Sequence, residues 1–127
     1  MEAPLRDLSP LTLAFVGDVV YELLAREHIV AQGNCPVKKL NAKKVELVCC
    51  QAQAKALRQL WPQLTEAERD TALRGRNAHV GHVPKNATVE DYHSATALEA
   101  LFGWLHLQGE SARLRQLFGW VIGEDTP

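Results

Sequence analysis

Apolar residues recur every three or four positions along most of the chain of 127 residues. This spacing places them on one face of an α-helix. In the first third of the chain the rhythm is carried by Leu11, Phe15, Val19, Leu23 and Val30. No segment alternates apolar and polar residues as a half-buried strand would, and no internal repeat is present. The pattern predicts an all-α fold.

Helix-capping residues give the boundaries of these predicted helices. Ser9 is suited to the N-cap of a first helix with Pro10 at its first position, and Gly33 closes it. A second helical stretch runs from Pro36 to Trp61, with Leu40, Val45, Leu47, Val48 and Leu57 on its inner face and a possible break near Cys50 or Gln51. Three further helices are predicted, over 65 to about 74 or 77, over 88–108 and over 111–122; the first opens with the capping box Thr65–Glu68.

The connection formed by residues 75–87 is longer than the two to eight residues that usually join helices. Arg74, Arg76 and Lys85 make it basic, and its glycines allow a ligand to approach the backbone. Loops of this length tend to bind something or to be disordered. A binding loop and a plain surface loop are both compatible with the pattern.

Bulk composition is that of an ordinary globular protein, and 127 residues are expected to form one domain. No apolar run reaches the length of about 20 residues that a membrane span needs, which predicts a soluble chain without a secretory signal. The three cysteines are Cys35, Cys49 and Cys50. An odd number with two adjacent fits neither a disulfide framework nor a metal site, so reduced thiols in a cytosol are expected.

Charge is distributed unevenly, although the net charge is only −1. Residues 26–85 carry eleven Lys and Arg against five acids, whereas the segments before and after them carry −3 and −4. A basic middle between acidic ends favours a phosphate-facing surface beside a carboxylate site. Asymmetry of this size also arises by chance.

Two carboxylates lie in otherwise apolar helices: Asp18 within Leu13–Val20 and Glu99 within Ala95–Gly103. Because an ionised carboxylate loses several kcal/mol of solvation on leaving water, this placement suggests a shared cation. Glu22 follows Asp18 by four residues and therefore shares its helix face. Magnesium prefers oxygen ligands, and it can activate water and stabilise charge on a phosphodiester. Pairing of each acid with a nearby Arg or Lys is the alternative.

Two segments resemble the ribonuclease III catalytic domain. Leu11–Leu24 is similar to its signature helix, which is built around a Gly-Asp step, and Ala95–Leu107 is similar to its second acidic helix. The resemblance is closer still to Mini-ribonuclease III, the short bacterial branch without a double-stranded-RNA-binding domain. The segments similar to that branch are Arg74–Ala78, Pro84–Asn86, and Tyr92 leading into Ser94–Leu101. Together the matches span roughly residues 8–122.

The resemblance implies a ribonuclease III-like helical fold over residues 1–127 and a magnesium-dependent endonuclease that cuts double-stranded RNA. It implies a cytoplasmic homodimer with one active site per subunit, no organic cofactor, and maturation of large-subunit (23S) ribosomal RNA. The catalytic, metal-binding acids of the family fall on Asp18 and Glu99. Longer members carry further acids where this chain has Ala14 and Thr96, so water, phosphate or Glu22 would complete the metal shell.

Duplex RNA is recognised mainly through its backbone and 2′-hydroxyl groups, so phosphate-binding side chains suffice. The candidates are Arg74, Arg76, Asn77, Lys85, Asn86, Lys39 and Lys43. For the lysines, a solvated helix face is an equal alternative. In the family, an aromatic residue at the position of Phe15 packs across the dimer interface; burial in the core of its own subunit is the alternative.

A catalytically silent RNA-binding or ribosome-assembly dimer with the same fold is the alternative function. The presence of both Asp18 and Glu99 favours the enzyme.

Overall fold

The computed structural model describes residues 4–78 and 81–124, and every regular element in these ranges is helical. The elements are η1 (Leu5–Asp7), α1 (Pro10–Ala31), α2 (Val37–Val48), α3 (Cys50–Leu60), η2 (Trp61–Gln63), α4 (Glu66–Arg76), α5 (Val89–Leu107) and α6 (Ser111–Ile122). The all-α prediction is confirmed.

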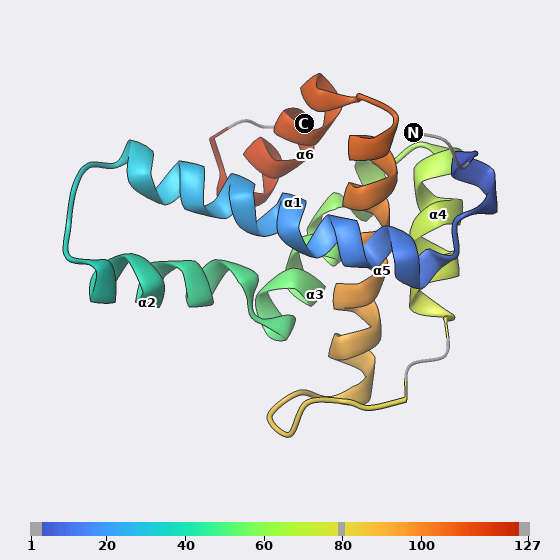
Figure 1. Cartoon of the computed structure of the whole chain (residues 1–127), viewed down its shortest axis with the longest axis horizontal. Helices are drawn as coiled ribbons and strands as arrows, with labels where there is room; N and C mark the ends of the chain where they lie inside the picture. Colours follow the sequence, from blue (N-terminus) through green and yellow to red (C-terminus); the bar gives the residue numbers. More distant parts are fainter. Residues whose placement is uncertain (1–3, 79–80, 125–127) are drawn as a thin grey trace.

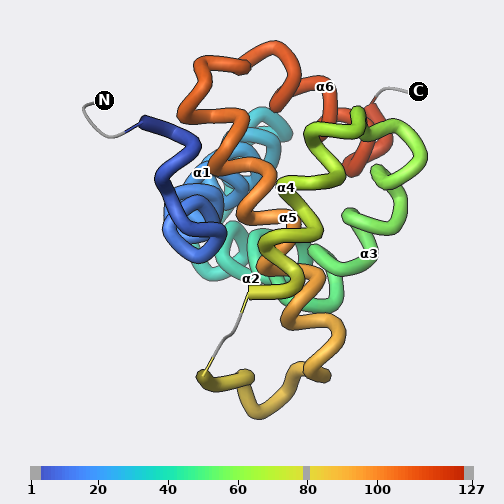
Figure 2. Tube along the Cα trace, turned by 90° about the vertical axis from the view of Figure 1, so that its right-hand side faces the viewer, coloured from blue at the N-terminus to red at the C-terminus, as the bar shows by residue number. Residues whose placement is uncertain are grey.

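Helix α5 forms the centre of the molecule (Figure 1). Helix α1 crosses it, α3 and α4 pack against it, and α2 runs back beside α1 after a tight connection. Helix α6 covers the end of α5 that lies away from the 77–88 connection (Figure 2). Because α5 has neighbours on several sides, most of its residues from Ser94 to Leu105 are buried.

Helices α1 and α5 share the most extensive contact, and two glycines allow their backbones to meet. A Cβ atom on Gly17 would lie 1.6 Å from the carbonyl oxygen of Glu99, and one on Gly103 would lie 1.9 Å from the carbonyl oxygen of Leu13. No side chain fits at such distances, so only glycine permits this crossing.

An aromatic cluster fixes α6 onto this pair of helices. The ring of Tyr21 meets Phe102 and Phe118 edge to face, at centroid distances of 5.0 and 5.4 Å. Burial raises the pKa of the Tyr21 hydroxyl. Arg113 ties α6 to the start of α4 through Glu68, 2.8 Å away, whose carboxylate also closes the capping box with Thr65.

Most predicted boundaries agree with the structure. The hydroxyls of Ser9, Thr65 and Thr88 each accept a hydrogen bond from a first-turn backbone N–H, and the predicted break falls at Cys49. The second predicted helix is therefore two helices, α2 and α3. The long connection is shorter than predicted, because α4 continues through Arg76 and leaves residues 77–88 between the helices.

The predicted inner face is wrong in part. Val45 is exposed, and α2 contains no buried residue. The apolar rhythm of the first helix likewise marks an outer face, since Phe15 is 80% exposed and Val19 67%. The buried face of α1 consists of Leu13, Ala14, Gly17, Tyr21, Ala25 and Ile29. At the crossing itself the residue of α1 that meets the backbone of α5 is Gly17, and the large apolar residues Phe15 and Val19 beside it are exposed.

No helix among the described residues is both long and apolar enough to cross a membrane.

Candidate active site

The crossing of α1 and α5 forms a pocket of about 400 Å³ that contains both predicted catalytic acids. Asp18 comes from α1 and Glu99 from α5, and the rest of the lining is Leu11, Ala14, Phe15, Tyr92 and Thr96. The glycine that allows the crossing directly precedes Asp18, and its contact is the backbone of Glu99 itself. The helix crossing therefore brings the two acids together.

The two carboxyl groups differ in their environment. Asp18 is exposed, so the expectation that it lies in an apolar surrounding is wrong; the neighbouring large apolar side chains point outward with it. Glu99 is half-buried, and its pKa is raised to about 8. Burial is the largest cause, followed by the charge of Asp18 and a hydrogen-bonding contact between the two carboxyl groups.

A pair of carboxyl groups in such contact suits a divalent cation. Two negative charges repel each other unless a proton or a cation lies between them, and oxygen atoms are the ligands that hard cations prefer. The described residues contain no group of three or more His, Cys, Asp or Glu that could hold a metal ion. The residues fit a cation that takes two ligands from the protein and the others from water or phosphate.

Ala14 and Thr96 are the positions at which the resemblance noted in the sequence implies acids in longer relatives. Ala14 is buried, and the Thr96 hydroxyl donates a hydrogen bond to the Tyr92 carbonyl, 3.0 Å away within α5. The Thr96 hydroxyl is thus engaged by its own helix.

Glu22 interacts with basic side chains. One of its carboxylate oxygens lies 3.0 Å from Arg26 on α1, and the other lies 3.9 Å from Lys44 on α2. It is not part of the pocket lining. Its role as a metal ligand stays a prediction.

The predicted RNA-binding residues are all exposed and lie on two surfaces. Lys39 and Lys43 are on α2. Arg74, Arg76, Asn77, Lys85 and Asn86 are at the end of α4 and in the connection that extends beyond the N-terminal end of α5 (Figure 2). Gln51 donates to the Asn86 carbonyl at 3.2 Å, which joins this connection to the start of α3. Arg76 lies 3.9 Å from Glu90.

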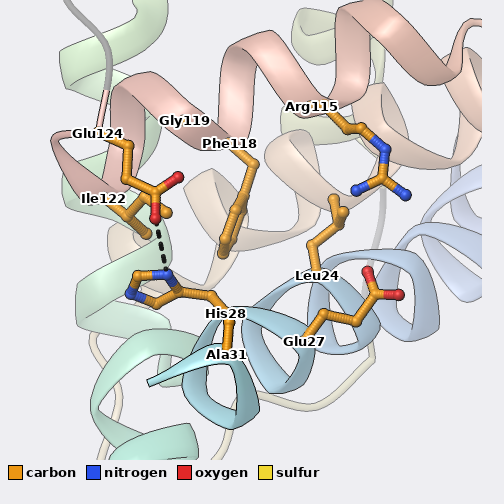
Figure 3. Close-up of a pocket in the computed structure, with 9 residues that line it drawn as sticks. All are labelled: Leu24, Glu27, His28, Ala31, Arg115, Phe118, Gly119, Ile122 and Glu124. Carbon is orange, nitrogen blue, oxygen red and sulfur yellow. Dashed lines mark ion pairs between the residues drawn. The ribbon is translucent and has the colours of Figure 1, made fainter. Parts of the chain in front are cut away.

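A larger cleft of about 520 Å³ lies between α1 and α6 (Figure 3). Phe118 projects from α6 into this cleft, and His28 pairs with Glu124 at 3.3 Å. Glu27 lies away from Glu124 in this view, so the two acids do not converge as Asp18 and Glu99 do. The smaller pocket at the α1–α5 crossing is therefore the better candidate for chemistry.

Two residues of the site were missed by sequence reasoning. Tyr92 lines the pocket, and its distance of seven residues from Glu99, two helical turns, places both on one face of α5. Gln53 on α3 is 3% exposed and acts to lower the pKa of Glu99, against burial and the charge of Asp18. Its only sequence signal was a polar residue between alanines just after the helix break.

A family model described as ribonuclease III domain matches residues 11–110. A protein named Mini-ribonuclease 3 from Thermoanaerobacter sp. is 46% identical over 110 residues, covering 87% of this chain and 78% of the relative. Another of that name, from Symbiobacterium thermophilum, is 42% identical, covering 87% and 85%. A crystal structure of a Fusobacterium nucleatum protein superposes with a TM-score of 0.86 at 30% identity, covering 93% of this chain and 96% of that one.

Replacing Asp18 with asparagine tests the electrostatic coupling of the pair. In the metal-free protein, the pKa of Glu99 is expected to fall from about 8 but to remain above 4.5, because burial, its largest cause, persists. Side-chain carbon-13 NMR titration measures this value. Glu22→Gln is the control and should leave the pKa of Glu99 unchanged; an unchanged pKa in Asp18→Asn would contradict the coupling.

The raised pKa of Glu99 also predicts how the stability of the metal-free protein depends on pH. Glu99 binds its proton more tightly in the folded than in the unfolded state, so the free energy of unfolding should decrease as pH rises from about 4.5 to about 8. A tenfold difference in proton affinity between the two states is equivalent to about 1.4 kcal/mol. Urea unfolding across this range should show a smaller decrease for Asp18→Asn than for the parent.

Proposed function

This chain belongs to the ribonuclease III family, and on that basis we propose that it is a magnesium-dependent endoribonuclease that cuts double-stranded RNA. The family resemblance seen in the sequence is confirmed, and so is the ribonuclease III-like helical fold. That the chain is a ribonuclease follows from its family. The metal, the residue roles and the RNA are the parts that we propose.

The contact between Asp18 and Glu99 carries this proposal, because it brings together two acids that are remote in sequence at the crossing of the two central helices. We assign catalysis and metal binding to this pair. A magnesium ion, when bound, supplies an activated water and stabilises charge on the phosphodiester. Asp18 is exposed and accessible to RNA, whereas Glu99 is half-buried on α5.

The chemistry of the neighbouring groups favours a hard cation. Cys50 is a thiol that senses the charge of Glu99. Burial is the largest cause that raises the pKa of Cys50, followed by the charges of Glu99, Cys49 and Asp91. The thiol therefore stays protonated at neutral pH in the metal-free protein. Carboxylate oxygens remain, and these suit magnesium with water in the open positions.

For the substrate we propose duplex RNA, and by family analogy the precursor of 23S ribosomal RNA. The exposed cations of α2, α4 and the 77–88 connection support a phosphate-facing surface without base-reading side chains. Arg76 and Lys85 are the principal cations of the connection. Free cysteines at positions 35, 49 and 50 are in keeping with a cytoplasmic protein. We also propose that residues 1–127 form one catalytic domain.

We further propose that the enzyme is a homodimer. Leu11, Phe15, Val19 and Leu23 follow one another at intervals of four on the exposed side of α1. Four large apolar side chains exposed along one helix face are typical of an interface. Phe15 and Leu11 also line the carboxylate pocket, so this face borders the active site of its own subunit.

Cleavage of duplex RNA in the presence of magnesium tests the enzymatic function. Asp18→Asn should lower the rate at least about 100-fold, because the site loses a charged metal ligand. Asp70→Asn, at an exposed acid on α4, is the control and should cut as the parent does. If the parent binds RNA but does not cut it, the chain is instead a catalytically silent RNA-binding dimer.

Salt dependence of RNA affinity tests the basic connection. In Arg76→Ala/Lys85→Ala the slope of log affinity against log salt should decrease by about 2, since two phosphate contacts are lost. Loss of the Arg76–Glu90 pair should cost little stability, because both side chains are exposed. Lys55→Ala/Arg115→Ala removes the same charges from α3 and α6; an equal change in both double variants would contradict the assignment.

Sedimentation velocity at micromolar concentration tests the dimer. Phe15→Asp should weaken association at least about tenfold, because it places a charge in the centre of the apolar face. Val89→Asp introduces the same charge at another exposed apolar position, on α5, and should sediment as the parent does. A parent that sediments as a monomer would refute the proposal.

A further inference from the structure

A second pocket of about 400 Å³, which we call the α3–α4–α5 pocket after the helices that form it, lies on the side of α5 that faces away from α1 (Figure 2). Ser94 and Thr96 are two residues apart on α5, so their side chains point to opposite sides of that helix. Ser94 lines the α3–α4–α5 pocket, and Thr96 lines the carboxylate pocket at the α1–α5 crossing. The two pockets are therefore separate and lie on opposite sides of one helix.

Apolar side chains form much of the wall of the α3–α4–α5 pocket. Leu57 and Ala72 are buried there, and Leu73 is 40% exposed. The half-buried Trp61 adds an aromatic ring, and Ser94, which is 9% exposed, adds a hydroxyl group. Apolar and aromatic walls with a few polar groups are typical of pockets that bind small ligands or parts of larger ones.

Trp61 is fixed in place by Arg69 of α4. The Arg69 guanidinium donates two hydrogen bonds to the Trp61 carbonyl, at 2.9 and 3.1 Å, and lies 5.7 Å from the centre of the ring. An aromatic ring that is already held loses little conformational freedom when a ligand stacks on it. Trp61 therefore gives the pocket a preorganised surface for a planar group.

Arginines from two different helices make the pocket positive. Arg58 of α3 and Arg76 of α4 both line it, and both are exposed. Glu90 of α5 also lines it and lies 3.9 Å from Arg76. The Glu90 side chain is 80% exposed, so water screens this ion pair and a phosphate competes with it at little cost. Arginines beside an aromatic wall suit a ligand that combines a phosphate with a planar ring.

From this lining we propose that the α3–α4–α5 pocket binds an unpaired nucleotide of the RNA, with its base against Trp61 and its phosphate against Arg58 and Arg76. The inference rests on the proposed function. Arg76 also belongs to the basic surface that we assign to duplex phosphates, so a strand that leaves the duplex there passes the pocket. Stacking on aromatic rings beside a basic groove is how single strands are bound, whereas the bases of a duplex are not available for it.

A purely structural role for Trp61 leads to a different expectation. If its ring only packed α3 against α4, its replacement would lower stability and would weaken the binding of every RNA alike. A nucleotide pocket predicts a loss that is confined to RNA with unpaired ends. The comparison of a blunt duplex with the same duplex carrying unpaired adenosines at every strand end separates the two roles.

Fluorescence anisotropy without magnesium, which leaves the RNA intact, measures the affinity for both RNAs. The parent should bind the duplex with unpaired ends about tenfold more tightly than the blunt one. Trp61→Leu should lose most of this preference and bind the blunt duplex as the parent does, whereas Trp61→Phe, which keeps a ring, should retain it. Trp120→Leu is the matched control: Trp120 is half-buried on α6 with Arg113 5.4 Å from its ring centre, and its replacement should keep the preference.

An exposed arginine gives a second variant in case Trp61→Leu does not fold. Arg58→Ala should lower the salt slope for the RNA with unpaired ends by about 0.7, the value for one phosphate of a single strand, and leave the slope for the blunt duplex unchanged. Lys55→Ala, at an exposed lysine on the same helix, is its control and should change neither slope. Equal changes in Arg58→Ala and Lys55→Ala would overturn the assignment.

Equal affinity of the parent for the two RNAs would also overturn the proposal. If AMP alone then bound to the parent but not to Trp61→Leu, the pocket would be a site for a free nucleotide instead. A parent that binds neither RNA would refute the proposed function itself, a result distinct from binding of the blunt duplex without any preference for unpaired ends.

Discussion

The active-site geometry depends on the contact between the backbones of α1 and α5. Gly17 and Gly103 bring the two helices closer than any side chain would allow, and Asp18 directly follows the first of these glycines. A wider crossing would move the two carboxyl groups apart while leaving each helix intact. Gly17 sets the separation of the two helices and thereby also the distance between Asp18 and Glu99.

The proximity of Asp18 and Glu99 causes an electrostatic repulsion that other groups of the protein do not fully compensate. Burial and the neighbouring charge make Glu99 retain its proton near neutral pH, and the amide of Gln53 offsets this only in part. A cation that replaced the proton would remove both the repulsion and the cost of desolvation. The raised pKa of Glu99 in the metal-free site is thus the electrostatic reason for proposing that a cation binds there, and perturbed pKa values are typical of functional sites.

Much of this arrangement was predictable from the sequence, because helix caps and the two interrupted apolar runs are local signals. Ser9, Thr65 and Thr88 cap helices as predicted, and the two acids converge as their segments suggested. The inner face of α1 was not predictable from apolar periodicity. The run Leu11, Phe15, Val19 and Leu23 is exposed, whereas Gly17 meets the backbone of α5, because separation at this crossing is limited by backbone atoms rather than by side chains.

Gln53 shows why the remaining part of the site needed coordinates. In sequence it is one glutamine among three in Gln51–Gln59, in a segment rich in alanine, and nothing local distinguishes it. Only the direction that α3 takes after the break at Cys49 buries this glutamine and leaves Gln51 and Gln59 exposed. Because Ala14 and Thr96 contribute no carboxylate to the pocket, Asp18 and Glu99 are the two acids among its lining residues.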